Sequence, residues 1–144
     1  MSDTDDVAAW AALLRVHAAL VPRLDQDLQT VCGLPLTWYD VLLELNSAPG
    51  RRLSMGELGR LAVISRSRVS RVVDALMDAG LVTRESNPDD KRSAYATITE
   101  AGRVRLRESA PAYLAGIRRY FTSRMTAAEA RTVARALEKV LAQE

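Results

Sequence analysis

The sequence predicts a mainly α-helical fold that carries one small β-hairpin. Apolar residues recur at helical spacing over most of the chain, most clearly in the segment 65–80. Two short segments that alternate polar and apolar residues, 81–85 and 94–99, flank a polar loop and are typical of paired strands. A capping box, Ser54-Met-Gly-Glu57, opens another short helix just upstream. This order of helix, turn, helix, strand, loop and strand outlines a winged helix-turn-helix.

The helix predicted over 65–80 separates an apolar face from a polar one. Its apolar stripe consists of Val69, Val72, Val73 and Leu76. The opposite face presents, from its centre to its edges, Ser67, Arg71, Arg68 and Ser70. Leu58 and Leu61 of the preceding short helix should pack against the stripe. The polar face is therefore predicted to be free to enter a groove of DNA.

Positive charge is concentrated on this part of the chain. A net charge of +2 over 144 residues is by itself a weak indication of a polyanionic partner. Between Arg51 and Arg71, however, six arginines accompany the single acidic residue Glu57. An arginine-rich run alone would most simply be a solvated face. Combined with the helix and hairpin pattern, it favours DNA.

The N-terminal part predicts two helices before this segment. The first spans about 5–32 and stops at Gly33, with a kink or local break at Pro22 because proline lacks the amide hydrogen. The second begins with Thr37 as its N-cap and Asp40 as the third helical residue. Its expected inward-facing residues are Trp38, Val41, Leu42 and Leu45.

The C-terminal part also predicts two helices. Thr99 is the expected N-cap of a helix that runs to about Arg124 and bends at Pro111. A capping box at Thr126 opens the last helix. The apolar faces of the terminal helices exceed what a lobe of roughly 65 residues can cover, which favours a second copy of the chain as the cover. An intramolecular helical bundle is the alternative.

We therefore expect a single chain unit over 1–144. A winged helix-turn-helix lobe occupies 37–99, and a helical dimerisation region comprises 1–33 and 100–144. The sequence shows no transmembrane run, and its acidic start lacks the features of a signal peptide, which predicts a cytoplasmic protein without a membrane partner.

The residue types present argue against an enzyme. The chain has one cysteine and one histidine, so neither an internal disulfide nor a zinc site of His and Cys is expected. No glycine-rich phosphate loop and no nucleophile with a suitable base is apparent. The sequence predicts no metal, no cofactor and no catalytic residue.

Four segments, in order, resemble the MarR family of bacterial regulators (multiple antibiotic resistance regulators). They are 52–59, 70–84, 87–92 and 98–102. The most specific piece is Asp90-Lys91-Arg92 in the loop of the hairpin, followed seven residues later by Thr99. The resemblance implies a homodimer whose first, fifth and sixth helices intertwine, so that two winged lobes meet one face of a palindromic site on double-stranded DNA. A repressor is the expected role.

Within this picture the second helix of the lobe reads the major groove. Arginine can bind guanine bidentately and serine can contact several bases, so Ser67, Arg68, Ser70 and Arg71 are the expected base contacts. Ser65 and Arg66 complete the expected DNA-binding set, with Arg66 directed to a phosphate.

The hairpin loop is expected to hold the minor groove. In the family pattern the arginine that matches Arg92 enters this groove, Asp90 positions it, and Lys91 meets a phosphate. A simple loop salt bridge between Asp90 and Arg92 is the alternative. Three further arginines, Arg51, Arg52 and Arg84, are candidates for contacts to the DNA backbone.

Regulators that resemble this family are often released from DNA by a small aromatic or lipophilic molecule, commonly an anion. A cleft between the dimerisation helices and the lobe would need apolar walls and a few polar groups. The candidate effector-binding residues are Trp10, Leu14, His17, Trp38, Leu42 and Tyr113. The alternative is that these aromatic and apolar side chains are simply core.

Two other functions stay open from the sequence. The first is a winged-helix module that binds another protein and has lost specific DNA binding. The second is a peroxide sensor, because one branch of the family uses a reactive cysteine. That cysteine lies near the start of the first helix, whereas Cys32 lies at its end, where the negative end of the helix dipole disfavours a thiolate.

Overall fold

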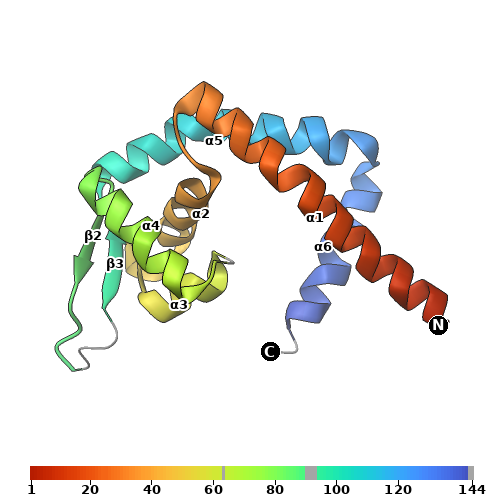
Figure 1. The fold of residues 1–144 in the computed structure, drawn as a ribbon, viewed down its shortest axis with the longest axis horizontal. Coiled ribbons are helices and arrows are strands. Elements are labelled where there is room, and N and C mark those ends of the chain that lie inside the picture. Colours follow the sequence, from red (N-terminus) through yellow and green to blue (C-terminus); the bar gives the residue numbers. More distant parts are fainter. Residues whose placement is uncertain (63, 90–93, 143–144) are drawn as a thin grey trace.

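The computed structural model describes residues 1–62, 64–89 and 94–142. Six α-helices and a small sheet follow one another along the chain (Figure 1). The elements are α1 (Asp3–Cys32), α2 (Leu36–Ser47), β1 (Arg52–Ser54), α3 (Met55–Leu61), α4 (Arg66–Asp78), β2 (Val82–Glu85), β3 (Tyr95–Ile98), α5 (Glu100–Tyr120) and α6 (Ala127–Leu141). Short 3-10 turns, η1 (Pro49–Arg51) and η2 (Thr122–Arg124), precede β1 and α6. The predicted fold class is confirmed.

The sheet contains one strand that the sequence analysis missed. Its order is β1-β3-β2, with both pairings antiparallel. The predicted hairpin is present as β2 and β3, and β1 pairs with the other edge of β3, where Leu53 lies opposite Ala96. Three residues carry too little alternation to reveal a strand, because such a strand depends on the edge that a distant segment offers it.

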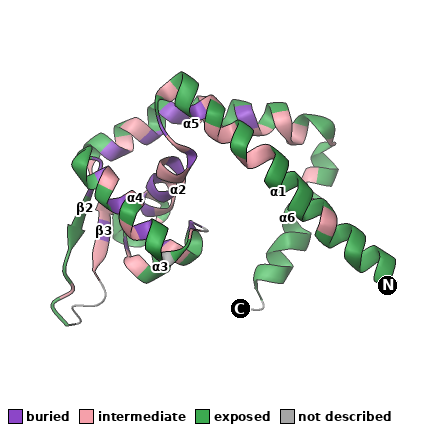
Figure 2. Ribbon diagram, viewed as in Figure 1, coloured by how far each residue is buried: buried purple, intermediate pink, exposed green. Residues whose placement is uncertain are grey.

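The hydrophobic core lies in the lobe formed by α2, α3, α4 and the sheet. Figure 2 shows buried residues gathered in this lobe and along the adjoining part of α5, whereas the N-terminal half of α1 and all of α6 are largely exposed. The core includes Val41, Leu42, Leu45, Leu58, Val69, Val73 and Leu76. Leu61 departs from the prediction. This residue is 51% exposed, and the residues of α3 that contact the core are Leu58, which is buried, and Met55.

The predicted helix caps at Ser54, Thr99 and Thr126 are present, and Ser65 caps α4 although the sequence analysis predicts no cap there. Each of these four side chains accepts a hydrogen bond from the backbone amide three residues later. At Thr126 the reciprocal bond from the backbone amide to Glu129 completes the capping box. At Ser54 the carboxylate of Glu57 instead accepts from the serine hydroxyl, at 2.9 Å. Local sequence therefore fixes these helix starts.

The start of α2 was predicted wrongly. The helix begins at Leu36 after Pro35, and Thr37 is inside it rather than at its N-cap. The carboxylate of Asp25, from α1, accepts the amide hydrogen of Leu36 at 2.8 Å and takes the place of a local cap. Asp40 thereby loses its predicted position as the third helical residue.

The two proline interruptions do not break the helices. α1 continues through Pro22 from Asp3 to Cys32 and ends at Gly33, whose φ of 65° is the left-handed conformation expected there. α5 continues through Pro111 but ends at Tyr120, short of Arg124, where the chain forms η2. The two helices also pack against each other.

Among the described residues, one helix, α1, is long and apolar enough to cross a membrane by length and composition alone. This corrects the expectation that the sequence contains no such run. A single helix of this kind near the N-terminus is weak evidence for a membrane segment. Its exposed apolar residues include Trp10, Leu13 and Leu14.

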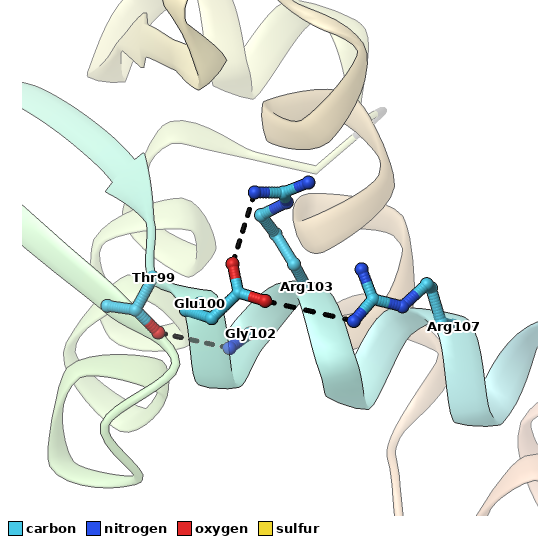
Figure 3. A network of polar contacts seen from close by, with 5 residues as sticks. All are labelled: Thr99, Glu100, Gly102, Arg103 and Arg107. Carbon is cyan, nitrogen blue, oxygen red and sulfur yellow. Dashed lines mark hydrogen bonds and ion pairs between the residues drawn. The ribbon is translucent and has the colours of Figure 1, made fainter.

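Thr99 fastens the end of the lobe to the start of α5. Its hydroxyl donates to the carbonyl of Gly80 at 2.8 Å and accepts from the amide of Gly102, as Figure 3 shows for the second bond. The amide of Thr99 donates to the carbonyl of Leu81 at 3.0 Å. A Cβ at Gly102 would overlap this same carbonyl oxygen, so the two backbones touch. Glu100 binds Arg103 and Arg107 on the next turns of α5.

Candidate nucleic-acid interface

The helix α4 presents a polar face to solvent, as its spacing predicts. Val69, Val73 and Leu76 are completely or almost completely buried, and Val72 is half-buried. On the other face Ser67, Arg68 and Arg71 are exposed, and Ser70 is half-buried. A helix of 13 residues with one side fixed in a core and the other open has the dimensions that the major groove admits.

The first turn of α4 is ordered by serines. The hydroxyl of Ser65 accepts from the amide of Arg68 at 3.4 Å and lies 3.3 Å from the hydroxyl of Ser67. Arg66 begins the helix, and its side chain lies outside the described residues. The unpaired amides of this turn and the helix dipole favour an anion such as a phosphate.

Two arginines with described side chains lie on the polar face of α4. Within the described part of the chain, neither Arg68 nor Arg71 forms an ion pair. The nearest acid on the same helix, Asp74, pairs instead with Arg84 of β2 at 3.6 Å. An exposed pair of this kind contributes little stability. Arg84 is thus partly neutralised, whereas Arg71 remains available to a polyanion.

The wing continues this surface. The guanidinium of Arg52 lies over the ring of Tyr95, 4.8 Å from its centroid, so the side chain crosses from β1 to β3. Arg51 is exposed beside it. At the start of the loop the side-chain oxygen of Asn87 accepts from the amide of Asp89 at 3.0 Å. The predicted minor-groove group Asp90, Lys91 and Arg92 lies outside the described residues.

A cavity of about 800 Å³ lies between α1, α2 and the helix-turn-helix. We call it the interhelix cavity. Apolar side chains of α1 and α2 form part of its wall, and its polar lining includes His17, Asp25, Thr37, Asp40, Glu44 and Arg68. Arg68 therefore belongs both to this wall and to the exposed surface of α4.

The structure brings only two of the predicted effector-binding residues to this cavity. They are His17 and Tyr113. Leu42 is completely buried in the core and does not line it, and Trp38 packs against the core. Trp10 and Leu14 lie on the exposed N-terminal half of α1. Apolar helical spacing does not distinguish a residue of the core from one that faces a cavity.

Sequence reasoning missed the acidic side of the cavity. Asp40 and Glu44 are one turn apart on α2, a spacing that places two like charges on one helix face. Burial and then the charge of Glu44 raise the pKa of Asp40 to about 6. Burial, then Asp40 and Glu44, raise the pKa of Tyr113, whose ring stacks on that of Tyr39 with centroids 4.2 Å apart.

Metal-binding side chains and the single cysteine are relevant to the chemistry that the sequence analysis considers. Among the residues that the structure describes, no cluster of three or more His, Cys, Asp or Glu side chains is suited to hold a metal ion. Cys32 ends α1 and is half-buried, and its main-chain carbonyl accepts from the guanidinium of Arg105 at 2.7 Å.

The fold and this surface define a winged helix-turn-helix protein that binds DNA: a helix with free arginines stands beside a three-stranded sheet whose hairpin extends past it (Figure 1). The MarR family model matches residues 33–93. The HTH-type transcriptional repressor Rv2887 of Mycobacterium tuberculosis is 34% identical over 140 residues, which cover 97% of this chain and 98% of that protein. The chain belongs to the MarR family.

Solved structures agree with this assignment. Sco3205, a MarR family transcriptional regulator from Streptomyces coelicolor, was crystallised in complex with DNA; it has a TM-score of 0.82 and 32% identity over 98% of this chain and 88% of that one. Rv2887, crystallised with p-aminosalicylic acid, has a TM-score of 0.69 and 34% identity over 90% and 95% of the two chains. The protein is a DNA-binding transcriptional regulator of the repressor type.

Proposed function

We propose that the protein is a homodimeric repressor that recognises a palindromic operator in the cytoplasm and is released from it by a small molecule. The observation that carries this proposal is the exposed face of α4, where Ser67 lies beside Arg68 and Arg71 on a helix anchored in the core, and neither arginine forms an ion pair among the described residues. Two such helices related by a twofold axis would meet half-sites one helical turn of DNA apart.

The exposed apolar faces of α1 and α6 support a dimer. Trp10 is 62% exposed, and Val140 and Leu141 are 64% and 66% exposed. Apolar surface of this extent on both terminal helices is typical of a protein interface. Residues 1–33 and 100–144 form the proposed dimerisation region, and 37–99 form the proposed DNA-binding lobe.

We assign the DNA contacts by groove. Ser67, Arg68, Ser70 and Arg71 read bases in the major groove, and Ser65 and Arg66 bind the backbone at the start of α4. From outside the described residues, Arg92 enters the minor groove with Asp90 beside it, and Lys91 binds a phosphate. Arg51 and Arg52 add backbone contacts at the base of the wing.

The interhelix cavity is the proposed effector site. It is lined by residues of α1 and α2 and by Arg68 of α4, so a bound molecule would contact both the proposed dimerisation region and the DNA-binding lobe. The p-aminosalicylic acid complex of Rv2887 gives a precedent for a small ligand in a related protein. His17 and Tyr113 are the effector-binding residues retained from the sequence prediction. An effector that favours a different spacing of the two lobes lowers DNA affinity by population shift.

DNA binding tests the reading role of α4. Affinities for the DNA upstream of the protein's own gene and for random DNA are measured by fluorescence anisotropy over a range of salt. A specific regulator binds the first at least about a thousandfold tighter. Arg71→Ala should weaken binding to the specific site alone, by about 1–3 kcal/mol of binding free energy. Arg71→Lys keeps the charge but cannot form two parallel hydrogen bonds to guanine, so it should also lose specificity.

Lys91→Ala should weaken binding to both DNAs and reduce the slope of log affinity against log salt concentration by about one. Equal losses on both DNAs from Arg71→Ala contradict base reading.

Sedimentation equilibrium tests the dimer separately. The wild-type chain should sediment as a dimer at micromolar concentration, and Val140→Asp should shift it toward monomer because a charge would be buried in the interface. Arg135→Asp, on the polar face of the same helix, is the matched control and should remain dimeric. A monomeric wild type would refute the twofold arrangement.

A further inference from the structure

Three carboxylates gather on one side of the interhelix cavity, and we call Asp40 and Glu44 its acidic wall. Asp25, Asp40 and Glu44 all line it, and Arg68 is the arginine in the wall. Asp25 is already engaged, since one of its oxygens accepts from the Leu36 amide at 2.8 Å and the other from Gln29 at 2.7 Å. Asp40 and Glu44 form neither a hydrogen bond nor an ion pair within the described part of the chain. Two carboxylates thus line the cavity without an ion pair among the described residues, and Arg68 in the same wall is paired with neither.

An aromatic surface stands beside these carboxylates. Tyr113 lines the same cavity, and its ring is held by stacking on Tyr39 at 4.2 Å and an interplanar angle of 28°. Burial, followed by the nearby charges of Asp40 and Glu44, raises the pKa of Tyr113 above its ordinary value near 10, which already leaves a phenol neutral at physiological pH. The face of a neutral tyrosine ring attracts cations, and the attraction grows where water is excluded. Carboxylates next to such a ring are the groups that a lipophilic cation requires.

We propose that the interhelix cavity selects a lipophilic cation, a protonated amine or quaternary ammonium carried on an aromatic or aliphatic body. The positive group lies between Asp40 and Glu44 against the ring of Tyr113, and the apolar body contacts the apolar wall, which includes Leu36, Leu43 and Ile64. The inference rests on the proposed effector site and departs from the aromatic anion that the family resemblance implies. An anion in this position would meet two like charges on one helix face.

Matched probes that differ only in charge test the proposal. Binding of 1-naphthylmethylamine, 1-naphthalenemethanol and 1-naphthoic acid to the full-length protein is measured by isothermal titration calorimetry at neutral pH. We expect the amine to bind about tenfold or more tightly than the alcohol, and the acid to bind most weakly, since a charge-assisted contact supplies a difference of this size. The acid is included because Rv2887 was crystallised with an aromatic acid.

Variants locate the source of the preference. Asp40→Asn combined with Glu44→Gln should remove the preference of the protein for the amine over the alcohol, whereas Glu108→Gln, an exposed carboxylate on α5 outside the cavity, should preserve it. Thermal unfolding verifies that each variant is folded. If the double variant does not fold, each single variant should still lose part of the preference.

The outcomes separate this inference from the proposed function. If the acid binds as tightly as the amine, or the preference survives in the folded variants, the charge selection is wrong. Release of operator DNA by the acid in that case would leave the proposed effector site standing. If all three probes bind with dissociation constants above about 1 mM, both the charge selection and the effector site are refuted.

Discussion

Replacing Asp40 by asparagine should stabilise the protein at neutral pH. Burial and the neighbouring charge of Glu44 raise the pKa of Asp40 from 3.8 to about 6. A shift of about two pKa units corresponds to about 3 kcal/mol against the ionised form. Asp40 is partly exposed, so solvent screening reduces the expected gain to about 1–2 kcal/mol. Asparagine has nearly the same shape and removes the charge.

The pH dependence gives this prediction its sign. The pKa of Asp40 is higher in the folded state than in the unfolded state, so the folded protein binds this proton more tightly. Protonated Asp40 therefore carries no penalty on folding below about pH 4, and the free energy of unfolding decreases as the pH rises from about 4 through about 6. The advantage of Asp40→Asn over wild type should therefore be small near pH 4, grow between about pH 4 and 6, and level off above about pH 7.

Urea unfolding at fixed protein concentration measures the effect. The concentration must be held constant because association contributes to apparent stability. The control is Asp78→Asn, an exposed aspartate at the end of α4 that lies outside the interhelix cavity. An Asp40→Asn variant that is no more stable than wild type at pH 7.5 would refute the account of the acidic wall.

Two further predictions concern packing. Gly102→Ala should destabilise the protein by about 1–3 kcal/mol, because a methyl group there overlaps the carbonyl oxygen of Leu81 and the backbones must separate; an unchanged midpoint in urea unfolding would contradict this contact. Leu76→Ala should cost about 2–5 kcal/mol, since the side chain is completely buried in the core. Met77→Ala, at the exposed neighbouring position, serves as its control, and equal losses in the two variants would contradict the assigned face of α4.

The features that the sequence predicts correctly are those that depend on near neighbours. Ser54, Thr99 and Thr126 cap their helices because a hydroxyl reaches an amide three residues away whatever the rest of the chain does. The stripe of α4 is equally local, because helical spacing alone places Val69 and Val73 on one side. These short-range rules suffice to recognise the DNA-binding lobe.

The features that it misses depend on distant partners. α2 begins at Leu36, whose amide donates a hydrogen bond to the carboxylate of Asp25 on α1. Because this partner is distant in the sequence, the residues around Thr37 alone indicate the wrong N-cap. β1 exists because β3 offers it an edge more than 40 residues away. The acidic wall was overlooked for a related reason: Asp40 and Glu44 share a helix face, but nothing local shows that this face borders a cavity.

The fastening at Thr99 has a mechanical consequence. The hydroxyl and the amide of Thr99 donate hydrogen bonds to the carbonyls of Gly80 and Leu81, which join the end of α4 to the start of α5. The two backbones are so close at Gly102 that a side chain would not fit between them. These contacts should hold the start of α5 in a fixed orientation relative to the end of α4, so we expect the two helices to move together. In the proposed dimer, a signal that changes the distance between the two copies of α4 should therefore move both copies of α5 as well.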